Sequence, residues 1–179
     1  MRMTTDDRSL GLAAAGGDAA AFASLLERHY DRMFGLAYRL TGQQAEAEDL
    51  TQDICAALPA KIRAYRGEAA FSTWLYRVTV NAAHDRRRRQ ATHAKAAHGW
   101  GDWEINRQAM IAEDVEAQTW LQTAMAKLPE PLRDTLALVL DDLNHAEVGT
   151  ILGISEGTVS WRVSEAKKHL RALKEEETT

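Results

Sequence analysis

Residues 71–89 read FSTWLYRVTVNAAHDRRRR, a run of apolar and small residues that ends in four consecutive arginines. Its apolar residues recur at spacings of three and four: Phe71, Trp74, Leu75, Val78 and Ala82. Polar residues recur at spacings of four, three and four: Arg77, Asn81, His84 and Arg88. Both patterns predict one amphipathic helix. We expect its apolar face to pack against a core and its polar face to be available for a partner.

Positive charge is concentrated around this helix. Residues 61–95 contain nine lysines and arginines and two acidic residues, a net charge of +7, whereas the whole chain has 22 basic and 26 acidic residues and a net charge of −4. A local basic patch of this kind predicts contact with a phosphate backbone. The helix macrodipole also favours cations at a helix C-terminus, but it accounts for one or two arginines and not for four in succession.

Two more helices are predicted before this basic helix. Apolar residues recur at helical spacing through 19–40, and Asp18 is placed to cap the start of that helix. The next helix, near 44–57, has no lysine or arginine and four acidic side chains: Glu46, Glu48, Asp49 and Asp53. Pro59 is expected to interrupt it. The second of these helices therefore presents an unusually acidic face.

The chain shows no convincing strand pattern. Apolar periodicity disappears between Gln90 and Asp114, which predicts a linker, and it returns at Val115. The sequence thus predicts an all-α fold of two small helical domains joined by a flexible linker. The expected boundaries are a flexible N-terminus over 1–17, a first domain over 18–90, a linker over 91–114, a second domain over 115–174 and a tail over 175–179.

The second domain contains a helix-turn-helix pattern, NHAEVGTILGISEGTVSWRVSEAKKHLRAL, at residues 144–173. Asn144 can cap a short helix, Gly153 permits a tight turn, and Ser155 can cap the next helix. That next helix has side chains facing away from its apolar stripe: Thr158, Trp161, Arg162, Glu165 and Lys168. In DNA-binding helix-turn-helix proteins this side enters the major groove. A helical hairpin that binds no DNA remains the alternative reading.

Several classes of protein are disfavoured by the sequence. The single cysteine, Cys55, excludes an intramolecular disulfide framework, and no Cys/His cluster has zinc spacing. The expected linker contains four residues that could suggest a ligand site but lack carboxylates at ligand spacing: His93, His98, Trp100 and Trp103. No secretory leader, membrane-spanning run or nucleophile–base pair is apparent. We expect a cytoplasmic binding protein that is not an enzyme, is not inserted in a membrane, and uses no cofactor or metal.

Five segments, in this order and spacing, resemble the extracytoplasmic-function (ECF) group of bacterial RNA polymerase sigma factors: GDAAAFASLLERHYDRMFGLAYRLTG, AEAEDLTQDI, FSTWLYRVTVNAAHDRRRR, LPEPLRDTLAL and ISEGTVSWRVSEAKKHL. The resemblance covers about residues 18–174. It implies a region 2 domain that binds the polymerase and the promoter −10 element, and a region 4 domain that reads the −35 element. The implied partners are core RNA polymerase, promoter DNA and an anti-sigma factor, since family members are commonly held inactive by one.

The resemblance also implies roles for individual residues. Binding to core polymerase falls on the acidic helix: Glu48, Asp49, Gln52 and Asp53. Binding to −10 DNA falls on the basic helix and the loop before it: Arg66, Phe71, Ser72, Arg77, Asn81, Arg86, Arg87, Arg88 and Arg89. Binding to −35 DNA falls on the helix-turn-helix: Ser155, Thr158, Ser160, Trp161, Arg162, Glu165 and Lys168. In this scheme the loop captures an unstacked base, while the arginine run holds the DNA backbone.

Two alternatives stay open. A stand-alone helix-turn-helix transcriptional regulator would also carry a C-terminal DNA reader, but it would need a dimerisation surface and would not need an acidic helix beside a basic one. Trp161 points away from the apolar stripe, so it could contact DNA or a protein such as an anti-sigma factor, and we favour DNA because polar groups surround it. Trp74 and Cys55 are predicted to pack within the fold.

Overall fold

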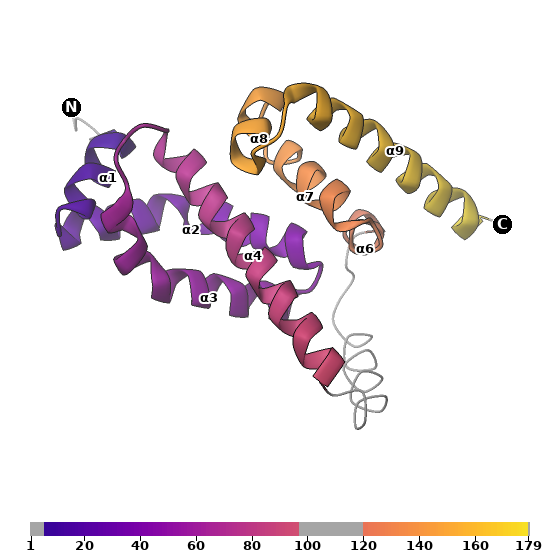
Figure 1. The fold of residues 1–179 in the computed structure, drawn as a ribbon, viewed down its shortest axis with the longest axis horizontal. Helices are drawn as coiled ribbons and strands as arrows, with labels where there is room; N and C mark the ends of the chain where they lie inside the picture. Colours follow the sequence, from indigo (N-terminus) through magenta and orange to yellow (C-terminus); the bar gives the residue numbers. More distant parts are fainter. Residues whose placement is uncertain (1–5, 97–119, 179) are drawn as a thin grey trace.

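A computed structural model of the chain describes residues 6–96 and 120–178. Every regular element within these two ranges is helical, which confirms the predicted all-α class (Figure 1). The elements are α1 (Asp7–Ala15), α2 (Ala19–Thr41), α3 (Gln44–Lys61), the 3₁₀ turn η1 (Ile62–Ala64), α4 (Phe71–Ala96), α6 (Trp120–Ala126), α7 (Glu130–Val139), α8 (His145–Leu152) and α9 (Glu156–Thr178). We call α1 to α4 the N-terminal bundle and α6 to α9 the C-terminal bundle.

Helix α2 is central to the N-terminal bundle, because α1, α3 and α4 all pack against it. The Asp18 side chain accepts hydrogen bonds from the N–H groups of Ala20 and Ala21 at 2.9 and 3.0 Å, so the predicted cap is confirmed. Gly42 ends the helix at φ 76°, a left-handed conformation that favours glycine. One face of α2 is almost completely buried: Leu25, Met33, Leu36, Ala37 and Leu40.

Helices α3 and α4 run further than the sequence predicts. The expected interruption at Pro59 is wrong, since α3 continues through it to Lys61. Pro59 lies in the last turn of α3, where the missing N–H removes one hydrogen bond shortly before the α-helix gives way to the 3₁₀ turn η1. Helix α4 passes the expected domain end at residue 90 and reaches Ala96, because no proline or glycine occurs in this stretch to stop it.

The expected flexible N-terminus is also corrected, because most of it forms α1. Asp7 binds this helix to α2 through Arg28 Nη1 at 2.8 Å and His29 Nε2 at 2.7 Å. Gly11 lies so close to the Tyr65 ring that a Cβ atom there would be 2.5 Å from it. Small residues thus let α1 pack closely, and they leave no apolar stripe that a periodicity search can find.

The C-terminal bundle contains the predicted helix-turn-helix. Asn144 and Glu147 form a reciprocal capping box at the start of α8. Gly153 joins α8 to α9 at φ 68°, so the predicted cap and turn are both confirmed. A Cβ atom on Gly149 would lie 2.7 Å from the Ile154 carbonyl oxygen. Glycine at this position therefore permits the close approach of the turn to α8.

The two bundles lie against each other (Figure 1). Helices α6 and α7 pack on α2, and α8 packs on α4. Buried apolar side chains of both bundles form one continuous cluster. The expected linker over 91–114 falls on the end of α4 and, beyond Ala96, on residues outside the described ranges. The expected tail over 175–179 is helical as far as Thr178.

Candidate nucleic-acid interface

Helix α4 exposes some of the residues that are predicted to bind −10 DNA. The exposed members on this helix are Arg77, Asn81, Arg88 and Arg89. Three of them, Arg77, Asn81 and Arg88, share one face, which we call the α4 face. Arg88 is 78% exposed, and its ion-pair partner is Asp85 of the same helix at 3.8 Å. Arg77 donates a hydrogen bond to the carbonyl oxygen of Thr150 in α8 at 2.8 Å, so one end of the α4 face is engaged by the other bundle.

Arg86 turns toward α3 and contacts three carboxylates there. Its Nε donates to Glu46 at 2.8 Å, and its two Nη atoms lie 3.2 Å from Asp49 and 3.3 Å from Asp53. The hydrogen bond to Glu46 and the neighbouring negative charges raise the pKa of the Arg86 guanidinium. Arg86 therefore links α3 to α4 within the bundle.

Arg87 turns the other way, toward the C-terminal bundle. Both of its Nη atoms donate to Asp134 of α7 at 3.1 Å, and Nη2 lies 3.5 Å from Glu130. His84 Nε2 donates to the same Asp134 carboxylate at 2.6 Å. The Asp134 side chain is 4% exposed, so this pairing is buried between the two bundles.

The loop before α4 places Phe71 inside an aromatic cluster. Phe71 is 4% exposed, and its ring centroid lies 5.7 Å from that of Tyr65 and 5.6 Å from that of Trp74. The predicted packing role of Trp74 is confirmed. Ser72, the residue after Phe71, is half-buried, and Arg66 in the loop is exposed. Capture of a base by this loop stays a prediction.

The predicted polymerase-binding residues are all exposed along α3: Glu48, Asp49, Gln52 and Asp53. We call this surface the α3 face. Asp49 and Asp53 share the Arg86 guanidinium, which offsets part of their charge. Glu48 instead accepts a hydrogen bond from Gln44 Nε2 of its own helix at 2.9 Å. A partner approaching α3 would therefore meet Glu48 as a carboxylate not shared with Arg86.

The predicted −35 residues begin at Ser155, just before α9, and continue along the first half of that helix. Some are exposed (Ser155, Ser160, Trp161 and Lys168) and the others are half-buried (Thr158, Arg162 and Glu165). Ser155 Oγ accepts a hydrogen bond from the Thr158 N–H at 3.2 Å, which confirms the predicted cap. Trp161 is 60% exposed, as expected from its position opposite the apolar stripe. Ser160 Oγ lies 2.9 Å from His145 Nδ1, a contact that the sequence did not reveal.

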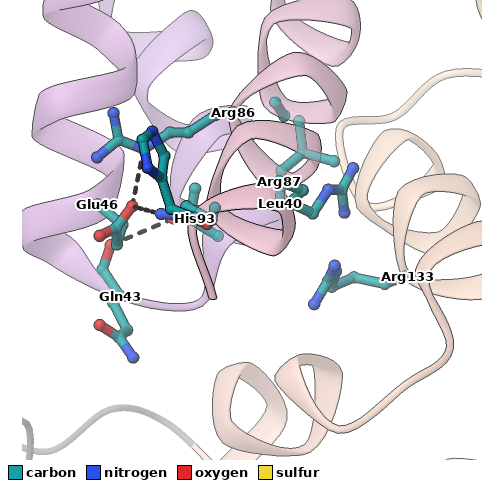
Figure 2. Close-up of a pocket in the computed structure, with 10 residues that line it drawn as sticks. Leu40, Gln43, Glu46, Arg86, Arg87, His93 and Arg133 are labelled. Carbon is teal, nitrogen blue, oxygen red and sulfur yellow. Dashed lines mark hydrogen bonds and ion pairs between the residues drawn. The ribbon is translucent and has the colours of Figure 1, made fainter. Parts of the chain in front are cut away.

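A cleft of about 650 Å³ lies between the arginine run and the C-terminal bundle (Figure 2). It is lined by Leu40, Thr41, Gln43, Glu46, Ala83, Arg86, Arg87, Gln90, His93 and Arg133. Arg133 reaches into it from α7, and its buried Nε has no hydrogen-bond partner among the described residues. Burial, reinforced by the charge of Arg87, lowers the pKa of Arg133. Positive charge therefore dominates the cleft walls.

Asp141 is a second acidic contact that sequence reasoning missed. It accepts hydrogen bonds from Arg39 at 2.6 Å and Arg32 at 3.4 Å, both on α2, and from the Tyr76 hydroxyl on α4. Burial and the hydrogen bond to Asp141 raise the pKa of Tyr76. The available signal was a second acidic residue seven positions after Asp134, at the end of the same apolar stretch.

Potential metal ligands also meet at the bundle interface. His84, Glu130 and Asp134 each offer a ligand atom, and these atoms lie within 4.8 Å of one another. The Arg87 guanidinium contacts both carboxylates, so the group is an ion-pair cluster as it stands. The predicted linker residues His98, Trp100 and Trp103 lie outside the described ranges. Within 6–96 and 120–178, none of the helices combines the length and apolar character needed to cross a membrane.

Comparison with known families matches both bundles. Residues 25–93 match Sigma-70 region 2, and residues 118–170 match Sigma-70, region 4. The first match contains most of the N-terminal bundle, including the α3 and α4 faces. The second contains α8 and α9 as far as residue 170, which includes every residue predicted to bind −35 DNA.

Similar proteins match over nearly the full chain. The ECF RNA polymerase sigma factor SigW of Bacillus subtilis is 30% identical, over 87% of this chain and 89% of its own length. The ECF RNA polymerase sigma factor SigM of Mycobacterium tuberculosis is 33% identical, over 96% of this chain and 86% of its own. Among solved structures, CnrH in complex with the cytosolic domain of CnrY has the same fold, with a TM-score of 0.69 and 23% identity over 94% and 97% of the two chains. The chain belongs to the ECF sigma factors of bacterial RNA polymerase.

Proposed function

We propose that this sigma factor uses three separate surfaces to bind its partners. The α3 face binds core RNA polymerase, the α4 face and the loop before it bind and melt the −10 element, and α9 reads the −35 element. The observation that carries this proposal is that an exposed acidic face and an exposed basic and polar face lie on two adjacent helices of one bundle. A chain that only bound duplex DNA would have no use for the acidic face.

The chemistry of each surface suits its proposed partner. Exposed carboxylates on α3 complement a basic or polar protein surface. Arg88 and Arg89 can neutralise phosphates without distinguishing bases, whereas the Asn81 amide can hydrogen-bond to a base edge. The exposed side chains at the start of α9 are those that a helix-turn-helix presents to the major groove.

The domain assignment follows the same division. The N-terminal bundle would act as the region 2 domain, with its functional part over 18–90, and the C-terminal bundle as the region 4 domain over 115–174. The chain would act in the cytoplasm as a non-enzymatic subunit of the polymerase.

Control by an anti-sigma factor is part of the proposal. It is supported by two proteins of the same fold that have been solved with such partners: CnrH with the cytosolic domain of CnrY, and the sigma factor RpoE with the anti-sigma factor NepR from Bartonella quintana. An anti-sigma factor for this chain would have to cover the α3 face, the α4 face or the exposed part of α9.

Reconstituted transcription tests this function. Core RNA polymerase is mixed with the purified chain and a library of promoter fragments, and the transcripts are sequenced. The proposal expects start sites that depend on the chain and share two conserved elements upstream. Sequence-specific gel shifts with the chain alone, together with no chain-dependent transcripts, would favour the stand-alone regulator instead.

A further inference from the structure

At the interface between the bundles, the hydrogen-bond donors come from one bundle and the acceptors from the other. The N-terminal bundle supplies hydrogen-bond donors, most of them cationic: Arg32, Arg39, Tyr76, Arg77, His84 and Arg87. The C-terminal bundle supplies acceptors: the carboxylates of Glu130, Asp134 and Asp141, and the carbonyl oxygens of Ala137 and Thr150. We call the three carboxylates the acidic edge. The C-terminal bundle therefore offers anionic oxygens to the basic side of the N-terminal bundle.

Asp134 is the most enclosed part of the acidic edge. Arg87 binds it through two Nη atoms, and His84 adds a third donor at 2.6 Å. An arginine fork meets a carboxylate with the same planar geometry that it uses for a phosphate. Because Asp134 is buried, removal of its partners would leave a charge without compensation, so this contact holds the bundles together only as a complete pair.

Asp141 makes an independent contact in the turn that follows α7. Arg39 reaches it at 2.6 Å and also donates from Nε to the Ala137 carbonyl oxygen at 3.2 Å. Arg32 adds a longer contact, and its guanidinium carbon lies 5.7 Å above the Tyr76 ring. The two acidic contacts thus fix the C-terminal bundle on both α2 and α4.

This arrangement occupies two arginines of α4 that the family resemblance assigns to −10 DNA. Arg87 is bound to Asp134 through both Nη atoms, and Arg77 commits Nη2 to the Thr150 carbonyl oxygen, so neither guanidinium has all of its donors available for a phosphate in this conformation. We propose that the acidic edge is an intramolecular competitor of promoter DNA, which keeps the free chain closed until the C-terminal bundle moves off α4. The proposal rests on the proposed DNA-binding role of α4.

The competition has a measurable consequence. If only the open chain can use all of α4, the apparent dissociation constant for DNA exceeds that of the open form by the inverse of the open fraction. Weakening the closed form should therefore tighten DNA binding, even when the substitution makes no contact with DNA. Polymerase would relieve the competition by holding the two bundles apart.

The test uses three single substitutions in the full chain. Asp141→Asn removes one acidic contact, Arg39→Gln removes its partner on α2, and Asp142→Asn is the matched control. Asp142 is exposed, makes none of the contacts above and has φ 61°, a conformation that asparagine tolerates. The radius of gyration is measured by small-angle scattering. Affinity is measured with a fluorescein-labelled single-stranded DNA of random sequence, about 20 nucleotides long, because phosphate contacts do not depend on sequence.

Arg39→Gln is the most informative variant, because a simple loss of positive charge and a loss of the intramolecular competition predict opposite changes in DNA affinity. Loss of a positive charge alone should weaken DNA binding. The competition instead predicts a larger radius of gyration and tighter binding, by about tenfold for a closed form that is 1.4 kcal/mol less stable. Asp141→Asn should behave in the same way, and Asp142→Asn should match the unmodified chain. Circular dichroism checks that all three variants keep their helices.

Three results would overturn the inference, and they differ in whether they also contradict the proposed function. An unmodified chain that is already extended, or an Arg39→Gln variant that binds DNA more weakly, contradicts the competition and leaves the proposed function intact. In the opened variant, Arg88→Ala should weaken DNA binding, since Arg88 lies on the α4 face and outside the interface. If Arg88→Ala has no effect there, α4 is not the DNA site, and both the proposed function and the competition fail.

Discussion

Arg86 of α4 donates a hydrogen bond to Glu46 of α3, with 2.8 Å between Nε and Oε2. Its guanidinium also lies within 3.3 Å of Asp53. One member of the run of four arginines therefore stabilises the bundle, although the family resemblance assigns all four to DNA. The four arginines should consequently respond differently to substitution.

Arg86→Ala should lower the free energy of unfolding by about 1–2 kcal/mol, at the lower end for charged hydrogen bonds because Asp49 and Asp53 are more than half exposed. Arg88→Ala should change it by less than about 0.5 kcal/mol, since Arg88 is on the surface. The salt dependence of DNA binding should show the reverse order, with a slope smaller by about 0.7 for Arg88→Ala. Urea denaturation and salt titration check both. Equal effects of the two substitutions on stability would contradict a structural role for Arg86 and a DNA-binding role for Arg88.

Glu48→Lys should weaken binding to core polymerase by about tenfold or more, because it places a positive charge on the α3 face where a basic or polar partner is expected. Reversal of Asp49 or Asp53 would be a poorer test, since either lysine would also repel Arg86. Glu27→Lys, an exposed position on α2, is the matched control. Affinity is measured by titrating labelled core polymerase. Equal affinities of the two variants would reject the α3 face as the docking surface.

Gly149→Ala should destabilise the C-terminal bundle by about 1–3 kcal/mol, because its Cβ would lie 2.7 Å from the Ile154 carbonyl oxygen. Gly157→Ala is the contrasting substitution. Gly157 lies in the first turn of α9 and has only the Ser155 hydroxyl near its Cβ position, at 3.8 Å. Alanine there should stabilise the helix by about 0.4–1 kcal/mol. Thermal unfolding of both variants gives the comparison, and a Gly149→Ala variant as stable as the unmodified chain would disprove the close approach.

Trp161→Ala should weaken promoter binding by about 1–3 kcal/mol and relax the base preference in the −35 element. The indole is 60% exposed at the start of α9, beside Arg162 and one turn before Glu165. Polymerase affinity should not change, which serves as the internal control. A variant that transcribes its own promoter normally but escapes a co-expressed inhibitor would assign Trp161 to a regulatory interface instead.

Local sequence signals are sufficient to predict the ends of helices that begin at a capping residue and end at a glycine turn. Asp18 and Gly42 delimit α2, and Asn144 and Gly153 delimit α8, because each acts on backbone groups within a few residues. Helix α1 also has a local cap, since the Asp6 side chain accepts a hydrogen bond from the Ser9 N–H, but no apolar period follows that cap to mark a helix. Its contact through Asp7 depends on residues 21 and 22 positions away, and its small residues form no apolar stripe.

The candidate surfaces were predicted as positions on helix faces, but their partners were not. Spacing placed Arg86 and Arg87 in a basic run, and it could not show that one faces α3 while the other faces α7. The Asp134 contact joins residues 47 apart, and the Asp141 contact with Arg39 joins residues 102 apart. Pairings of that kind depend on how the bundles dock, which helical periodicity does not encode.

The central claim is that the α4 face lies on the −10 element during initiation, and Asn81 provides the most direct test. A photoreactive phenylalanine analogue is placed at position 81, and at position 27 of α2 as a control, and each chain is assembled with core polymerase on a promoter recovered from the transcript sequencing. Crosslinking from position 81 should map to the −10 element, and Asn81→Ala should change the base preferred there. No crosslink from position 81, or the same pattern from position 27, would contradict the account.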